Sequence, residues 1–166
     1  MKFRFCPLCS ERLVEKDLGD DKNVPFCEKC NRPFFPHSAP CVIVLPVTES
    51  GKAALTRQSY GETEKFVLTA GFMGEGESAE ETCARELFEE LGLKAKKLTY
   101  LKSYGYEKRD TLMLGFAALV SEDDFCLSDE VTEAKWVSLD EAEELLKNST
   151  VAKMLLKEYR ARQKNP

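Results

Sequence analysis

Residues 71–93 constrain the fold of this chain more than any other stretch. They read GFMGEGESAEETCARELFEELGL, with glycines at both ends. Ser78, followed three residues later by Glu81, has the form of a capping box and predicts a helix that begins at Ala79. Gly92 supplies the left-handed residue that ends such a helix. The stretch therefore predicts a glycine-rich loop that leads into one amphipathic helix.

The apolar residues of this helix recur at three- and four-residue spacing. They predict a buried stripe of Ala84, Leu87, Phe88 and Leu91. Such a stripe needs a sheet or another helix to cover it, so the helix is expected to pack against a core.

The other face of the helix is acidic. Glu86, Glu89 and Glu90 stand at i, i+3 and i+4, so their carboxylates project into one small volume. Like charges so placed repel one another unless a cation shares the site. Hard divalent cations such as Mg²⁺ take oxygen ligands of this kind. The alternative is an acidic helix face that is simply solvated.

The spacing of the fixed residues decides between these alternatives. Five residues separate Gly71 from Glu77, seven more lead to Arg85, and the stretch closes on Gly92-Leu93. These five residues, Leu87 and the three glutamates fill all nine fixed positions of the Nudix box within 23 residues. The sequence therefore resembles the Nudix hydrolases. The resemblance covers residues 40 to about 162 and implies an α/β fold, an α/β/α sandwich around a mixed sheet.

The same resemblance implies roles for the box residues. Glu86, Glu89 and Glu90 are expected to bind catalytic Mg²⁺ or Mn²⁺, and Glu77 is expected to pair with Arg85 and lock the loop onto the helix. The general base is expected to be Glu89, Glu90 or a glutamate from a later loop. Divalent cations would neutralise a pyrophosphate and lower the pKa of a bound water.

Glu130 has two interpretations. It resembles a fourth metal-contacting glutamate found in several Nudix enzymes, just before the strand that contains Trp136. The alternative is an exposed acid in the loop run Ser-Asp-Glu at residues 128–130.

Two CxxC pairs near the N-terminus predict a separate small unit. Cys6 with Cys9 and Cys27 with Cys30 are separated by 17 residues that contain turn-forming residues. Two such knuckles give four thiolates in a tetrahedral arrangement, which is typical of a structural zinc ribbon. A thioredoxin-like redox pair would explain one CxxC but not two. We expect a zinc ribbon over residues 1–36 and a Nudix domain over residues 37–166.

The order of ribbon and box resembles the NADH pyrophosphatases. Their stretch SQPWPFPxSLM corresponds here to residues 103–113, which match it at Ser103 and at Leu112-Met113. The three prolines and the tryptophan in its middle are replaced, so the motif associated with NADH selectivity has diverged. The family's large N-terminal domain has no counterpart in this sequence.

Substrate-binding residues are carried over from that family or stand where its motif diverges. The family's ring-stacking residue and a helix-start alanine have counterparts here, and the glycine-rich loop lets backbone approach the substrate. Two tyrosines lie in the diverged middle of the motif. The resulting set is Phe72, Gly71, Tyr104, Tyr106 and Ala152. A core position is the alternative for Phe72, and solvated strand ends are the alternative for the residues of 104–110.

Composition limits the partners. The net charge of −5 argues against binding to duplex nucleic acid, and no apolar run reaches membrane-spanning length. The sequence has seven cysteines, and this odd number argues against a closed disulfide framework. There is also no room for a signal peptide before Cys6, so we expect a cytoplasmic location. A homodimer is expected from the family resemblance.

Three functions are consistent with the sequence. The first is metal-dependent cleavage of the diphosphate in NADH, NAD or a related compound such as ADP-ribose, which extends to an RNA 5′-end that carries a dinucleotide cap. The second is a housecleaning hydrolase for nucleotide sugars or nucleoside triphosphates. The third is a non-catalytic module that senses nucleotides or RNA.

Overall fold

The computed structural model describes residues 3–61 and 63–164. The chain divides into two compact units, Met1–Ala39 and Pro40–Pro166. The division falls between residues 39 and 40, whereas the sequence-based boundary lies between residues 36 and 37. Residues 165–166, the end of the C-terminal tail, lie outside the described residues.

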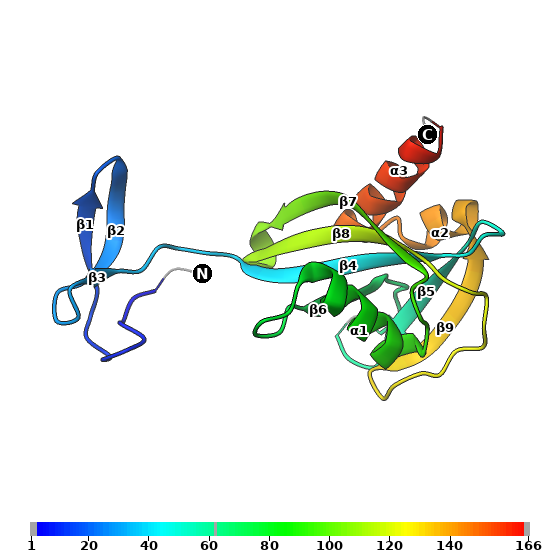
Figure 1. Cartoon of the computed structure of the whole chain (residues 1–166), viewed down its shortest axis with the longest axis horizontal. Coiled ribbons are helices and arrows are strands. Elements are labelled where there is room, and N and C mark those ends of the chain that lie inside the picture. The colour runs from blue at the N-terminus through cyan, green and yellow to red at the C-terminus, as the bar shows by residue number, and fades with distance from the viewer. Residues whose placement is uncertain (1–2, 62, 165–166) are drawn as a thin grey trace. The chain divides into compact units, whose positions relative to one another are not determined.

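The first unit is a small antiparallel sheet (Figure 1). Its strands are β1 (Val14–Leu18), β2 (Asp21–Cys27) and β3 (Arg32–Pro33), in the order β1-β2-β3. Gly19 takes φ 61° in the turn between β1 and β2, a conformation that favours glycine. This turn agrees with the turn-forming residues that lie between the two CxxC pairs.

The second unit is built on a six-stranded sheet. Its strands are β4 (Ala39–Val47), β5 (Lys52–Gln58), β6 (Thr69–Phe72), β7 (Lys97–Tyr106), β8 (Thr111–Leu119) and β9 (Val131–Ser138). The order is β7-β8-β4-β5-β9, and β6 pairs with β4.

The directions of the strands make this sheet mixed. β7 and β8 form an antiparallel hairpin joined by the short 3₁₀ helix Glu107–Arg109, and β5 pairs antiparallel with β9. β4 and β8 instead run in the same direction. The Cys41 thiol contacts the Leu112 carbonyl at the start of both strands, and the Val120 N–H donates to the Val47 carbonyl at their ends. The expected mixed sheet is therefore confirmed.

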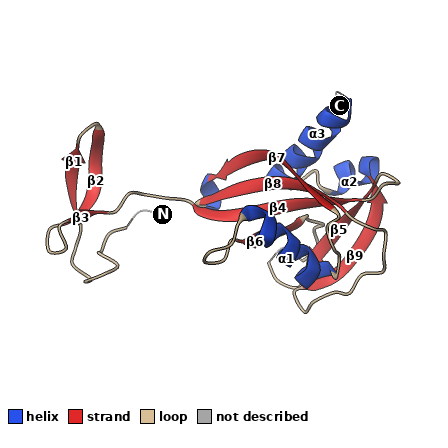
Figure 2. Ribbon diagram, viewed as in Figure 1, coloured by secondary structure: helices blue, strands red, loops and turns tan. Residues whose placement is uncertain are grey.

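Helices cover both faces of the sheet (Figure 2). β4 shows why, because successive side chains on a strand point to opposite faces. Val42 and Val44 pack in one apolar cluster with residues of α1 (Ala79–Leu91). Ile43 and Leu45 pack in a second cluster with residues of α2 (Leu139–Leu145) and α3 (Thr150–Lys164). The α/β/α sandwich that the sequence predicts is confirmed.

The ends of α1 also follow the prediction. The Ser78 hydroxyl accepts from the Glu81 N–H at 3.2 Å, and a Glu81 carboxylate oxygen accepts from the Ser78 N–H at 2.9 Å. Gly92 takes φ 71° and closes the helix. These contacts complete the capping box and the left-handed C-cap.

The predicted buried stripe of α1 is partly wrong. Leu87 and Leu91 are buried, but Ala84 and Phe88 are exposed, and Cys83 takes their place in the core. Cys83, Leu87 and Leu91 stand at i, i+4 and i+8, so the buried face is rotated towards this row. The rotation turns a glutamate of the acidic face inward, as the next subsection describes.

Among the described helices, none combines the length and the apolar character that crossing a membrane requires.

Candidate active site

Arg85 joins the glycine-rich loop to α1. Its Nε and Nη2 atoms donate to the two carboxylate oxygens of Glu77 at 2.7 and 2.9 Å, a bidentate pair. Nη2 also donates to the Phe72 carbonyl at 3.1 Å. The structure thus brings together Glu77 and Arg85 as the Nudix resemblance implies. Through Phe72 and Glu77, Arg85 ties both ends of the glycine-rich loop to the helix.

Glu77 accepts further hydrogen bonds that the sequence did not suggest. The Gly74 N–H and the buried Thr82 hydroxyl donate to its Oε2 atom at 2.8 and 3.0 Å. Arg85 first, and then the Gly74 N–H, lower the pKa of Glu77 to about 2. Hydrogen bonds and a positive charge favour the ionised form, so Glu77 stays charged at neutral pH.

Gly71 occupies a position with no room for a side chain. A Cβ atom built on it would lie 1.8 Å from Oε1 of Glu86. The Glu86 carboxylate therefore lies directly against the backbone of β6, which a residue with a side chain would prevent. Arg85 donates to the same Oε1 atom from Nη1 at 2.7 Å and to Glu89 at 3.0 Å.

Glu90 is buried although it belongs to the acidic face of α1. Its side chain is 4% exposed, and its Oε2 atom has no hydrogen-bond partner within the described residues. Burial, with a smaller contribution from the charges of Glu86, Glu130 and Glu89, raises the pKa of Glu90 to about 7, while the nearby Thr69 hydroxyl acts in the opposite direction. A buried carboxylate oxygen without a partner is costly unless a cation neutralises it. This donor set therefore fits a hard divalent cation.

These carboxylates line a cavity of about 260 Å³. The lining residues are Arg85, Glu86, Glu89, Glu90, Ser128 and Glu130. Glu130, from the loop before β9, is thus brought to the box carboxylates, and Ser128 is a lining residue that the sequence did not suggest. The metal-binding role of Glu130 stays a prediction, now with a position that suits it.

The carboxylate oxygens are not drawn together as tightly as metal ligands would be. Within the described residues, only the four ribbon cysteines place three or more potential ligand atoms within 4.8 Å of one another. Arg85 pairs with both Glu86 and Glu89. The assignment of Glu86, Glu89 and Glu90 as metal ligands stays a prediction.

The four cysteines of the first unit have the geometry of a zinc site. Cys6 and Cys30 lie 3.9 Å apart and Cys9 and Cys27 lie 3.6 Å apart, measured between Sγ atoms. A tetrahedral zinc with Zn–S bonds of about 2.3 Å has sulfur–sulfur edges of roughly 3.8 Å. A disulfide would need about 2.05 Å, and all four are free thiols. The cluster could therefore hold one metal ion with four sulfur ligands.

The expected substrate-binding residues occupy different surroundings. Phe72 is 63% exposed beside Arg85, and Tyr106 is partly buried at the end of β7. Tyr104 and Ala152 are buried in the apolar cluster under α2 and α3, and neither lines the carboxylate cavity. The structure places only Phe72 and Gly71 next to the box residues, and all five roles stay predictions.

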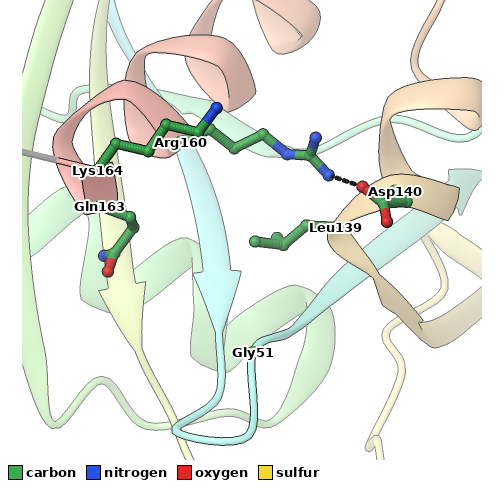
Figure 3. A pocket seen from close by; sticks show the side chains of 6 residues that line it. All are labelled: Gly51, Leu139, Asp140, Arg160, Gln163 and Lys164. Carbon is green, nitrogen blue, oxygen red and sulfur yellow. Dashed lines mark hydrogen bonds and ion pairs between the residues drawn. The ribbon is translucent and has the colours of Figure 1, made fainter.

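A second depression is formed by the β4–β5 turn, α2 and α3 (Figure 3). Arg160 points across it to Asp140 and also pairs with Glu143. Both carboxylates neutralise the guanidinium. None of its lining residues belongs to the carboxylate cavity, and we assign it no function.

Comparison with known proteins identifies the family. The family model described as "NUDIX domain" matches residues 37–158, and the chain belongs to this family. The fold also matches solved structures. A NUDIX hydrolase from Nitrosomonas europaea superimposes with a TM-score of 0.65 at 22% identity, over 82% of this chain and 78% of that one. The NUDIX domain of Shewanella oneidensis NrtR, complexed with ADP ribose, gives a TM-score of 0.65 at 18% identity, over 83% and 94%.

Curated relatives share most of the chain, ribbon included. "NAD-capped RNA hydrolase NudC" of Pseudomonas aeruginosa is 34% identical over 160 residues, 96% of this chain and 56% of that protein. The protein of the same name from Edwardsiella ictaluri is 31% identical over 156 residues, 93% and 59%. The chain spans somewhat more than half the length of these relatives. The suggested resemblance to the NADH pyrophosphatase group is confirmed by this sequence identity over most of the chain.

Proposed function

We propose that the chain is a divalent-metal-dependent pyrophosphohydrolase that cleaves the diphosphate of NADH, NAD or a related compound such as ADP-ribose. The observation that carries the proposal is the cavity in which Glu90, whose buried Oε2 atom has no hydrogen-bond partner among the described residues, faces Glu86, Glu89 and Glu130. The relatives described as NAD-capped RNA hydrolases support the choice of substrate class.

In this proposal the protein's own residues hold and orient the reacting groups. Glu86, Glu89, Glu90 and Glu130 would hold Mg²⁺ or Mn²⁺, which neutralises the phosphates and lowers the pKa of water when bound. Arg85 and Glu77 fix the loop that faces the substrate. In the reaction, a water oxygen bonds to phosphorus, the bridging P–O bond breaks, and a mononucleotide leaves.

The remaining assignments belong to the same proposal. The four cysteines would hold one structural Zn²⁺, since a site closed by four thiolates leaves no open position for catalysis. A dinucleotide cap on an RNA 5′-end would be a substrate of the same chemistry. The expected homodimer and cytoplasmic location stay predictions.

A panel of substrates tests the proposal. We expect the purified protein, given Mg²⁺ or Mn²⁺, to hydrolyse NADH or NAD to two mononucleotides, or ADP-ribose to a mononucleotide and a sugar phosphate, with the products identified by mass. Glu89→Gln should lower turnover by several orders of magnitude, whereas Glu80→Gln, on an exposed position outside the box consensus, should retain it. If a nucleoside triphosphate or nucleotide sugar has a kcat/KM more than about tenfold higher, the housecleaning function replaces this one. Absence of turnover with every substrate would favour the non-catalytic module.

A further inference from the structure

The loop that follows β5 brings an exposed aromatic ring to the carboxylate cavity. The Ser59 N–H donates to the Glu130 carbonyl at 2.8 Å, and β5 pairs with β9 as far as Gln58 opposite Val131. The next residue, Tyr60, is thereby placed beside Glu130, which lines the cavity. Its ring is 54% exposed, so it is available to a ligand.

The surroundings of the Tyr60 hydroxyl agree with this position. Partial burial raises the pKa of Tyr60, and the charges of Glu130, Glu90 and Glu86 raise it further, while Arg109 acts in the opposite direction. Both signs of charge are therefore within electrostatic reach of the ring. Arg109, from the β7–β8 connection, is exposed.

Phe72 is a second exposed ring whose backbone contacts a residue that lines the cavity. Its carbonyl accepts from Arg85, which lines the cavity at the end of the glycine-rich loop, and its ring is 63% exposed. Two exposed rings thus border a cavity lined by carboxylates. A dinucleotide has a matching layout, because two rings flank a central pyrophosphate. Aromatic side chains stack on any base, whatever hydrogen-bond donors and acceptors the base carries, because every base has an aromatic face.

We propose that Tyr60 binds the second ring of the substrate, so that one base of a dinucleotide stacks on Phe72 and the other on Tyr60. This inference rests on the proposed function, since it assumes that the pyrophosphate lies at the carboxylates. It deepens that function by favouring substrates with two rings over nucleotide sugars and triphosphates, which have one base.

Steady-state kinetics of three variants test the role of Tyr60. Tyr60→Ala should lower kcat/KM for NADH about two- to tenfold, mainly through KM, because a stack formed in both ground and transition states acts on binding. Tyr60→Phe keeps the ring and should behave as the unaltered protein. Phe88→Ala is the matched control, since Phe88 is equally exposed at 54% but its ring lies against Lys94, whereas the residue before Tyr60 is hydrogen-bonded to Glu130. It should leave kcat/KM unchanged.

The substrate comparison separates stacking from a general effect on the site. With NADH, Tyr60→Ala and Phe72→Ala should both lower kcat/KM. With ADP-ribose, which lacks one of the two rings, only one of these variants should do so. The inference is overturned if Tyr60→Ala matches the unaltered protein with NADH, or if both variants lose as much with ADP-ribose as with NADH.

A binding measurement keeps this inference distinct from the proposed function. The affinity of NAD for the Glu89→Gln variant, measured by calorimetry with and without Tyr60→Ala, requires no turnover. Weakening by about two- to tenfold supports Tyr60 even if the protein hydrolyses no dinucleotide, an outcome that overturns only the proposed function. Equal affinities, or no binding of NAD, overturn the role of Tyr60.

Discussion

The backbone of Gly71 and the carboxylate of Glu86 lie in direct contact, and a Cβ atom on Gly71 would fall 1.8 Å from Glu86 Oε1. The atom in the way is the end of a flexible side chain, so Gly71→Ala should displace this carboxylate without unfolding the protein. We expect an almost unchanged melting temperature. Turnover should fall by roughly 10²-fold, the typical cost of moving a site group by about 1 Å.

The control for this variant is another glycine with space around it. A Cβ atom on Gly105, in β7, would meet no atom of the described residues within 4 Å, and its backbone does not require glycine. Gly105→Ala should therefore change neither stability nor turnover by much. A Gly71→Ala protein that is fully active would show that the position of Glu86 does not matter for the reaction.

The Glu77–Arg85 pair predicts a pH-dependent contribution to stability. Arg85 lowers the pKa of Glu77 to about 2, from 4.5. A lowered pKa in the folded state gives stability that is present above the unfolded value and is lost as the pH falls from about 4.5 towards 2. Glu77→Gln should therefore melt at a lower temperature than the unaltered protein at pH 7, and the difference should shrink between pH 4.5 and pH 2.5.

Calorimetry or circular dichroism across this pH range checks the prediction. Glu80→Gln, which removes an exposed carboxylate from the first turn of α1, is the control and should shift the melting temperature little at any pH. If Glu77→Gln lowers the melting temperature by the same amount at pH 7 and at pH 2.5, the charge of Glu77 does not stabilise the loop.

How much of this site the sequence could predict depends on how local the signals are. The ends of α1 follow from Ser78, Glu81 and Gly92, which act on their own neighbours along the chain. The burial of Glu90 does not, because it depends on how the helix is rotated against the sheet, and the helical periodicity fits Phe88 and Cys83 on the core face equally well.

Long-range contacts explain the other omissions. Tyr60 reaches the cavity only because β5 pairs with β9 and places Ser59 against Glu130, a pairing that no local pattern encodes. Tyr104 and Ala152 show the reverse case. The family motif gives their place along the chain, whereas their burial under α2 and α3 is set by the packing of the sheet.

The buried carboxylate of Glu90 predicts how the protein responds to metal. Mg²⁺ or Mn²⁺ should raise the melting temperature of the unaltered protein, because a ligand that binds only the folded state stabilises it. Glu90→Gln removes a buried carboxylate whose Oε2 atom has no hydrogen-bond partner in the described part of the chain, and it should abolish most of this shift. A thermal melt with and without EDTA measures it. Glu80→Gln is the reference variant. If Mn²⁺ raises the melting temperature of Glu90→Gln as much as that of Glu80→Gln, the metal binds elsewhere.

The four-cysteine cluster predicts that metal stabilises the first unit separately from the second. The purified protein should contain about one zinc per chain, as a single site of four thiolates requires. Cys27→Ser removes one ligand of a cluster whose sulfurs all lie within 4.8 Å, so zinc content should fall and the small sheet β1-β2-β3 should lose stability. Turnover should persist in part, because the carboxylate cavity belongs to the other compact unit.

Cys126→Ser, a change at an exposed free cysteine outside the cluster, should leave the zinc content unchanged. Elemental analysis, a thermal melt and an activity assay on the same preparations measure all three quantities, and a zinc-free protein of normal stability would refute a structural metal in the ribbon.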